Sequence, residues 1–145
     1  MSSPIKGRGA QKQTHNRFFE HRHEVLDEYL NFCESEGESA DTNKTQYLEV
    51  FPKSFVNKVQ SPDIGMGFSA NPYQCCEHGC VYCYARNSHE YWGYGAGLDF
   101  ERKILVKKNA PDLLEQKLRN PNWQGNTIVF SGNTDCYQPI EKKLE

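Results

Sequence analysis

Four cysteines with the spacing of a metal-binding loop lie near the middle of the chain, at positions 75, 76, 80 and 83. The last three form the pattern C-x3-C-x2-C, and Gly79 lets the backbone bend tightly just before Cys80. Iron–sulfur clusters are held by thiolates from short, closely spaced cysteine runs. Three thiolates on a four-iron cluster would leave one iron open to a substrate or cofactor, as in an open catalytic metal site. The pattern therefore indicates Cys76, Cys80 and Cys83 as ligands of a [4Fe–4S] cluster.

Zinc is the alternative that these residues leave open. A structural zinc ion takes four ligands, and His78 or Cys75 would supply the fourth beside the three cysteines. Zinc knuckles generally bring their ligands as two separated pairs, which this triple does not. Under this alternative the chain would be a non-catalytic zinc- or nucleic-acid-binding module. Cys75 itself is interpreted as a bystander, because its spacing to Cys80 does not fit the cluster pattern.

The bulk properties limit the class of protein. The 145 residues fit one domain, and 37% hydrophobic with 25% charged residues is a polar but globular composition. A net charge of −2 does not favour a general electrostatic attraction to nucleic acid or membranes. No apolar run approaches the roughly 18 residues that cross a bilayer, and the N-terminus lacks the apolar stretch of a secretory signal. We therefore expect a cytoplasmic protein without membrane contact, whose six cysteines are ligands or free thiols rather than disulfides.

The segments before the cysteines are predicted to form an extension. Residues 1–17 carry four basic residues and no acid, which indicates a flexible, solvated basic arm. Apolar residues at helical spacing predict a helix over residues 18–33. Residues 45–51 predict a short strand that Pro52 ends. Residues 54–59 favour neither helix nor strand.

The segments after the cysteines alternate between helix and strand. Residues 81–92 predict a helix that the following glycines end, and residues 104–106 predict a strand. A helix over residues 110–118 and a strand over residues 127–130 follow. This alternation indicates the α/β class with a parallel sheet.

The helix over residues 110–118 has the clearest local signals. Asn109 suits the N-cap position, because an Asn side chain can accept a hydrogen bond from a free backbone N–H of the first turn. We expect Leu113, Leu114 and Leu118 to form its buried face.

Other side chains around the cysteines have less specific meanings. His78 and His89 are interpreted as polar loop or surface residues rather than ligands. The aromatic side chains within residues 82–94 are interpreted as core, with stacking on nucleic-acid bases as the alternative. The sequence assigns no role to Glu101.

Several segments together resemble the radical S-adenosylmethionine (SAM) superfamily. Its signature is the C-x3-C-x2-C pattern with an aromatic residue before the last cysteine, here Tyr82. More narrowly, the chain is similar to an uncharacterised group of radical SAM proteins related to spore photoproduct lyase. The segments that carry this likeness are NPYQCCEHGCVYCYAR, GLDFERKILVKKNAP and SGNTDCYQPIE, with KGRGA and SPDIG upstream. The likeness covers nearly the whole chain.

The resemblance implies an α/β fold that is the N-terminal part of a partial (β/α) barrel. Residues 65–145 would begin this core domain, after a flexible arm over residues 1–17 and a helical or irregular extension over residues 18–64. A complete barrel of this kind takes about 200 residues or more. We therefore expect the chain to be the N-terminal fragment of a longer protein.

The resemblance also implies an activity. Cys76, Cys80 and Cys83 would bind the [4Fe–4S] cluster of an enzyme that reductively cleaves SAM to a 5′-deoxyadenosyl radical. Tyr82 would lie near the adenine of SAM, and a loop with Thr134 and Asp135 would help to bind SAM. Its partners would be a reductant protein such as flavodoxin or ferredoxin and a nucleic-acid or nucleobase substrate. The fragment alone, without later strands, is also a candidate for an inactive form that binds a cluster poorly.

The chain departs from the pattern of these relatives at two places. The group usually has glycine where this chain has Cys75. Spore photoproduct lyases have a hydrogen-donating cysteine at the place of Gly132, whereas Cys136 follows Asp135 in this chain. The photoproduct-repair reaction is therefore not carried over. Arg86 would contact the cluster or the SAM carboxylate, or else pair with an acid.

Overall fold

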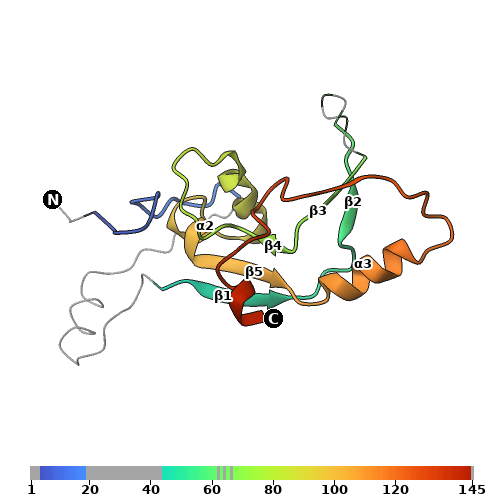
Figure 1. The fold of residues 1–145 in the computed structure, drawn as a ribbon. Helices are drawn as coiled ribbons and strands as arrows, with labels where there is room; N and C mark the ends of the chain where they lie inside the picture. The colour runs from blue at the N-terminus through green and yellow to red at the C-terminus, as the bar shows by residue number, and fades with distance from the viewer. Residues whose placement is uncertain (1–3, 19–43, 62, 64, 66, 145) are drawn as a thin grey trace.

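The structure is a computed structural model that describes residues 4–18, 44–61, 63, 65 and 67–144. The helix predicted over residues 18–33 lies outside the described residues, apart from Phe18. The remaining residues form a mixed α/β fold with two small sheets and few helices (Figure 1). The α/β class is confirmed at this level.

The first sheet has the strand order β1-β5-β4. β5 (Lys103–Lys107) lies in the middle, and its central Ile, Leu and Val side chains are buried. β1 (Gln46–Val50) pairs with it in parallel, with Tyr47 opposite Ile104. β4 (Tyr73–Gln74) pairs with it in antiparallel orientation. The strands predicted over residues 45–51 and 104–106 are therefore confirmed.

The second sheet has the strand order β2-β3-β6. β2 (Val56–Lys58) pairs antiparallel with β3 (Phe68–Ala70), which pairs in parallel with β6 (Ile128–Phe130). The expected parallel sheet is thus wrong, since both sheets are mixed. A short connection joins β2 to β3 and allows antiparallel pairing, whereas parallel partners need a crossover of a dozen or more residues.

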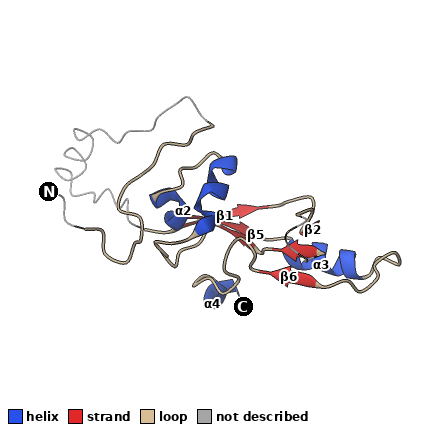
Figure 2. Ribbon diagram, turned by 90° about the horizontal axis from the view of Figure 1, so that it is seen from above, coloured by secondary structure: helices blue, strands red, loops and turns tan. Residues whose placement is uncertain are grey.

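The helices agree only in part with the sequence. The segment predicted as a helix over residues 81–92 is a 3-10 helix, η1 (Tyr84–Trp92), and Gly93 ends it with a φ of 88°. A further helix, α2 (Leu98–Arg102), was not predicted. The chain closes with α4 (Glu141–Leu144). η1 and α2 lie at one end of the molecule, and α3 lies at the other (Figures 1 and 2).

α3 (Ala110–Leu118) has the bounds that the sequence predicted. Its N-cap residue, Asn109, makes no side-chain capping bond: its Nδ2 donates to the carbonyl oxygen of Pro52 at 2.9 Å, and its buried Oδ1 has no hydrogen-bond partner among the described residues. Leu113 and Leu114 pack against the second core cluster as expected. The expectation for Leu118 is wrong, since this side chain is 49% exposed.

Two hydrophobic clusters hold these elements together. The first cluster lies under the cysteines and is centred on Phe100, Ile104 and Val106. Cys76 and Cys83 pack against its edge. The second cluster lies between α3 and the second sheet, around Phe55, Val56, Ala70 and Ala110. Among the residues that the structure describes, no helix combines the length and apolar character needed to cross a membrane.

The N-terminal residues 5–17, here called the N-terminal strap, do not form the solvated arm that the sequence indicated. Arg8 Nη1 donates to the carbonyl oxygen of Glu101 at 2.6 Å. Asn16 is 7% exposed and donates to the carbonyl oxygen of Glu90 at 2.8 Å. Carbonyl groups of η1 and α2 therefore hold the strap at Arg8 and Asn16, while residues 11–15 are exposed.

Candidate metal centre

The cysteine loop begins directly after β4 and is tied to its surroundings by backbone hydrogen bonds. Cys75 follows β4 with a φ of 73°, in the left-handed region that favours glycine. The next N–H, of Cys76, donates to the carbonyl oxygen of Phe100 at 3.2 Å. Cys83 N–H donates to the carbonyl oxygen of Cys80 at 3.3 Å and closes a turn. Cys75 therefore holds a backbone conformation that glycine adopts more readily than other residues.

A carboxylate of the loop ties it to β1 as well. Glu77 accepts hydrogen bonds from Thr45 Oγ1 at 3.0 Å and from the Tyr47 hydroxyl at 2.5 Å. Burial, together with this bond to the Glu77 carboxylate, raises the pKa of Tyr47 to about 12. Tyr47 therefore remains a neutral donor at physiological pH.

The three predicted ligands, Cys76, Cys80 and Cys83, are free thiols of intermediate exposure. Tyr82, between the last two, is 86% exposed. All four predicted residues of this loop therefore lie on one short segment and are at least partly exposed to solvent.

The donor chemistry of the loop fits an iron–sulfur cluster, since it offers three accessible thiols within eight residues. Their side chains are not gathered, however. Within the described part of the chain, no group of three or more His, Cys, Asp or Glu side chains is arranged to hold a metal ion. Binding a cluster would therefore require the three side chains to turn toward a common point.

Cys75 points away from this triple and into the core. Its Sγ lies 2.5 Å from Nδ1 of His89, and both side chains are fully buried. Burial raises the pKa of Cys75 and lowers the pKa of His89 to about 4. Both groups are therefore neutral at physiological pH and form a hydrogen-bonded pair in the core.

The surroundings of His89 correct its interpretation as a surface residue. Its ring stacks on Tyr94 at 5.0 Å between centroids and meets Phe100 edge-on at 5.8 Å. The sequence did not reveal this because the two neighbours come from the turn after η1 and from α2. The aromatic residues nearby were interpreted as core, and this interpretation is wrong for two tyrosines. Tyr84 and Tyr91 are 79% and 75% exposed instead of buried.

The His89 environment predicts an acid-sensitive fold. In the unfolded chain the imidazole binds a proton below its usual pKa of about 6.5, whereas in the folded chain it stays neutral down to about 4. The free energy of unfolding should therefore fall as the pH decreases from 6.5 to 4, by up to about 3 kcal/mol from this group. Denaturant unfolding at several pH values measures this slope.

Two variants separate His89 from the carboxylates that titrate in the same range. The slope should be shallower in His89→Gln, which removes the titrating group, and unchanged in the control His78→Gln, since His78 is exposed. An equal slope in His89→Gln and the unmodified chain would contradict the prediction.

The second predicted loop, residues 131–135, begins directly after β6 and contacts the cysteine loop. Thr134 is buried, and its hydroxyl donates to the carbonyl oxygen of Cys75. Gln138 joins the loops again, since its Oε1 accepts from the Glu77 N–H at 3.2 Å. The structure thus brings together the two loops that the sequence singled out.

Asp135 is the more accessible of the two predicted SAM-binding residues. Its Oδ1 accepts from the Tyr137 N–H at 2.8 Å, and its Oδ2 lies 3.9 Å from His78 Nε2. The Asp135 side chain is 43% exposed. Its carboxylate is therefore available to a ligand, whereas the Thr134 hydroxyl is engaged within the protein.

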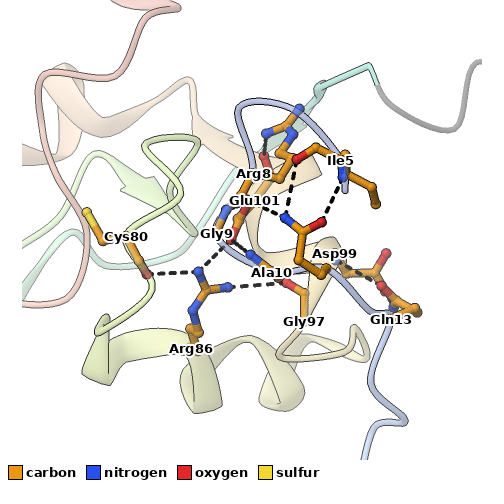
Figure 3. Close-up of polar contacts among 11 residues, drawn as sticks. Ile5, Arg8, Gly9, Ala10, Gln13, Cys80, Arg86, Gly97, Asp99 and Glu101 are labelled. Carbon is orange, nitrogen blue, oxygen red and sulfur yellow. Dashed lines mark hydrogen bonds and ion pairs between the residues drawn. The ribbon is translucent and has the colours of Figure 1, made fainter. Parts of the chain in front are cut away.

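The sequence assigned no role to Glu101, which is connected to the cysteine loop through Arg86. Glu101 is fully buried, and its Oε1 lies 2.5 Å from Arg86 Nη2. The same Arg86 nitrogen donates to the carbonyl oxygen of Cys80 at 2.9 Å (Figure 3). Of the roles open to Arg86, the structure shows pairing with an acid. The sequence carried no signal for this role, since Asp99 lies only two residues before Glu101 in the same helix.

A cavity of about 360 Å³ lies elsewhere, against α3. Its lining is mostly apolar and includes Phe55, Leu114 and Phe130. None of the six predicted site residues lines it.

Comparison with known proteins finds relatives of unknown function. Over 96 residues, the chain is 39% identical to uncharacterized proteins of Mycobacterium tuberculosis and Mycobacterium bovis. That alignment covers 66% of this chain and 28% of each relative. An uncharacterized protein of Methanocaldococcus jannaschii is 32% identical over 103 residues, which are 71% of this chain and 36% of the relative. The chain therefore spans well under half of the length of these curated relatives. No family model and no solved structure matches it.

Proposed function

We propose that this chain carries the cluster-binding segment of a radical SAM enzyme. Cys76, Cys80 and Cys83 would hold a [4Fe–4S] cluster, and Asp135 would contribute to the SAM site with Tyr82 near the adenine. When bound and reduced, the cluster supplies the electron that cleaves SAM. The observation that carries the proposal is the C-x3-C-x2-C loop itself, with three free, partly accessible thiols.

The contact between the two loops supports the same proposal. The cysteine loop and residues 131–135 each follow a strand directly and are joined by the Thr134 hydroxyl. The Asp135 carboxylate, which is 43% exposed and lies beside His78 of the cysteine loop, would be the residue of this loop that contacts SAM. This carboxylate is a hydrogen-bond acceptor, which suits an amino group.

The substrate, reductant and location belong to the proposal as well. A nucleic-acid or nucleobase substrate rests on the resemblance to the lyase group, and the electron would come from a flavodoxin- or ferredoxin-type protein. A reducing, cytoplasmic environment would keep the cysteines free for metal. Further α/β units completing a partial barrel would supply the substrate contacts.

One observation favours the zinc alternative. Nδ1 of His78 lies 3.3 Å from Cys76 Sγ, and His78 Nε2 faces Asp135. Cysteine and histidine are both zinc ligands, and His78 would be the fourth ligand beside Cys76, Cys80 and Cys83. A zinc- or nucleic-acid-binding module without catalysis is therefore the second candidate function.

Anaerobic reconstitution with iron and sulfide tests the first candidate against the second. We expect a reduced [4Fe–4S] cluster whose EPR signal changes on adding SAM, because SAM would bind the open iron. Metal and acid-labile sulfide analysis of the same sample distinguishes the candidates directly. Stoichiometric zinc without sulfide, and no cluster after reconstitution, would refute the radical SAM proposal for this chain.

A further inference from the structure

The buried carboxylate of Glu101 sits between three segments that are far apart in the sequence. Its Oε2 accepts from the Gly9 N–H at 3.1 Å, and its Oε1 accepts from the Ala10 N–H at 2.8 Å. On the other side, Arg86 Nη2 lies 2.5 Å from Oε1. Figure 3 shows the carboxylate enclosed by the strap and the Arg86 guanidinium. A buried carboxylate is tolerated only where charge and hydrogen bonds compensate it, and all three partners do so.

Arg86 connects the Glu101 carboxylate to the cysteine loop. Its Nη2 donates to the carbonyl oxygen of Cys80 at 2.9 Å, and its Nη1 donates to that of Gly97 at 3.5 Å. The guanidinium lies over the ring of Phe100 at 5.3 Å. A planar guanidinium held by these contacts has little freedom to move. The carbonyl of Cys80 is therefore held by a rigid group.

The strap also touches the loop backbone directly. A Cβ atom added to Gly9 would overlap the carbonyl oxygen of Gly79, the residue before Cys80. At Lys12, farther along the strap, the approach is equally close. A Cβ atom added to Gly97, which lies outside the strap, would overlap the carbonyl oxygen of Lys12. The close contacts between the strap and the rest of the protein at Gly9 and Gly97 therefore require glycine, because any side chain there would overlap a backbone carbonyl group.

We propose that Glu101 is a positioning residue for the cysteine loop. Together with Arg86 and the N-terminal strap it forms a brace, defined as Gly9, Ala10, Glu101 and Arg86, that fixes the backbone at Cys80, from which the Cys80 side chain would turn toward the other two thiols to bind a metal centre. This inference rests on the proposed function for the identity of the metal. The brace itself is a property of the metal-free chain.

Three substitutions test different parts of the brace. Glu101→Gln replaces one acceptor oxygen with an NH₂ group that faces other donors. Arg86→Lys keeps the charge but cannot contact the carboxylate and two carbonyl groups at once. Gly9→Ala forces the strap away from Gly79.

Two matched controls carry the same changes at sites away from the loop. Glu115→Gln removes an exposed ion pair with Arg119 on α3, where the two side chains are 59% and 79% exposed. Gly67→Ala adds a methyl group where no atom lies within 4 Å. Circular dichroism would verify that each variant is folded, and Arg86→Lys and Gly9→Ala keep the test decisive if Glu101→Gln does not fold.

The first readout is amide hydrogen exchange of residues 76–83 in the metal-free chain. We expect these amides to exchange faster in the three brace variants than in the unmodified chain. In the two controls we expect the same exchange rates as in the unmodified chain. The second readout is iron retention after reconstitution, under challenge with a chelator. Loss of groups that orient metal ligands typically costs about 10- to 100-fold in metal affinity, and we expect a loss of this size.

The two readouts distinguish failure of the brace from failure of the proposed function. Unchanged exchange in all three brace variants would overturn the inference. Unchanged iron retention in variants whose loop exchanges faster would show that the brace does not position a metal ligand, which also overturns it. Faster exchange in a chain that accepts no iron–sulfur cluster even when unmodified would uphold the brace and refute the radical SAM proposal.

Discussion

Under the radical SAM proposal, replacing Cys80 with alanine is expected to prevent both [4Fe–4S] cluster assembly and SAM cleavage while leaving the chain folded. The fold should survive because the structural contacts of Cys80 are made by its backbone carbonyl, which accepts from Arg86 and from the Cys83 N–H. The side chain is only partly buried. Two thiolates are fewer than the three that a cluster with one open iron needs. Iron, acid-labile sulfide and 5′-deoxyadenosine formation measure the outcome.

Cys136→Ala is the matched control for this prediction. Cys136 is also a free thiol of intermediate exposure, but it lies outside the C-x3-C-x2-C pattern. We expect this variant to bind the cluster as the unmodified chain does. A Cys80→Ala variant that still cleaves SAM would remove Cys80 from the ligand set and end the present assignment.

Replacing Phe100 with alanine is expected to lower the free energy of unfolding by about 3–5 kcal/mol, the usual cost of removing a buried aromatic ring. Phe100 is 2% exposed and belongs to the first core cluster. Its ring contacts His89 edge-on and supports the Arg86 guanidinium. The cavity would therefore lie directly beneath the cysteine loop. Urea unfolding monitored by circular dichroism measures the loss.

Phe51→Ala provides the control, because Phe51 is 69% exposed and its truncation leaves no cavity. We expect this variant to change the free energy of unfolding by less than about 0.5 kcal/mol. Equal effects of the two substitutions would show that the first core cluster contributes little to stability.

The local signals in the sequence were sufficient for individual elements. The bounds of α3, the strands β1, β5 and β6, and the end of η1 at Gly93 follow from apolar spacing, β-branched residues and glycine. The pairing of these strands did not follow. Both sheets are mixed, because strand direction depends on which distant segments meet and not on the residues within a strand.

The sequence by itself determined the donor set of the candidate site. Three cysteines at C-x3-C-x2-C spacing must lie on one short loop in any fold, since few residues separate them. The exposure of Tyr82 did not follow from the sequence, since this side chain was interpreted as core with its aromatic neighbours and is 86% exposed. The resemblance implied that the loop with Thr134 would share a site with the cysteines, and the Thr134 hydroxyl does donate to the carbonyl oxygen of Cys75.

Only the tertiary structure decided how that loop is held, and it places Cys75, which its spacing had already excluded from the ligands, in the core beside His89. Glu101 accepts from Gly9 across 92 residues, and Cys75 meets His89 across 14 residues. No sequence periodicity connects positions so far apart. The residue type alone also does not reveal whether a Glu or His side chain is buried or exposed. Burial is what changes their chemistry. It makes Cys75 and His89 a neutral pair, and it makes the carboxylate of Glu101 depend on the N-terminal strap and Arg86.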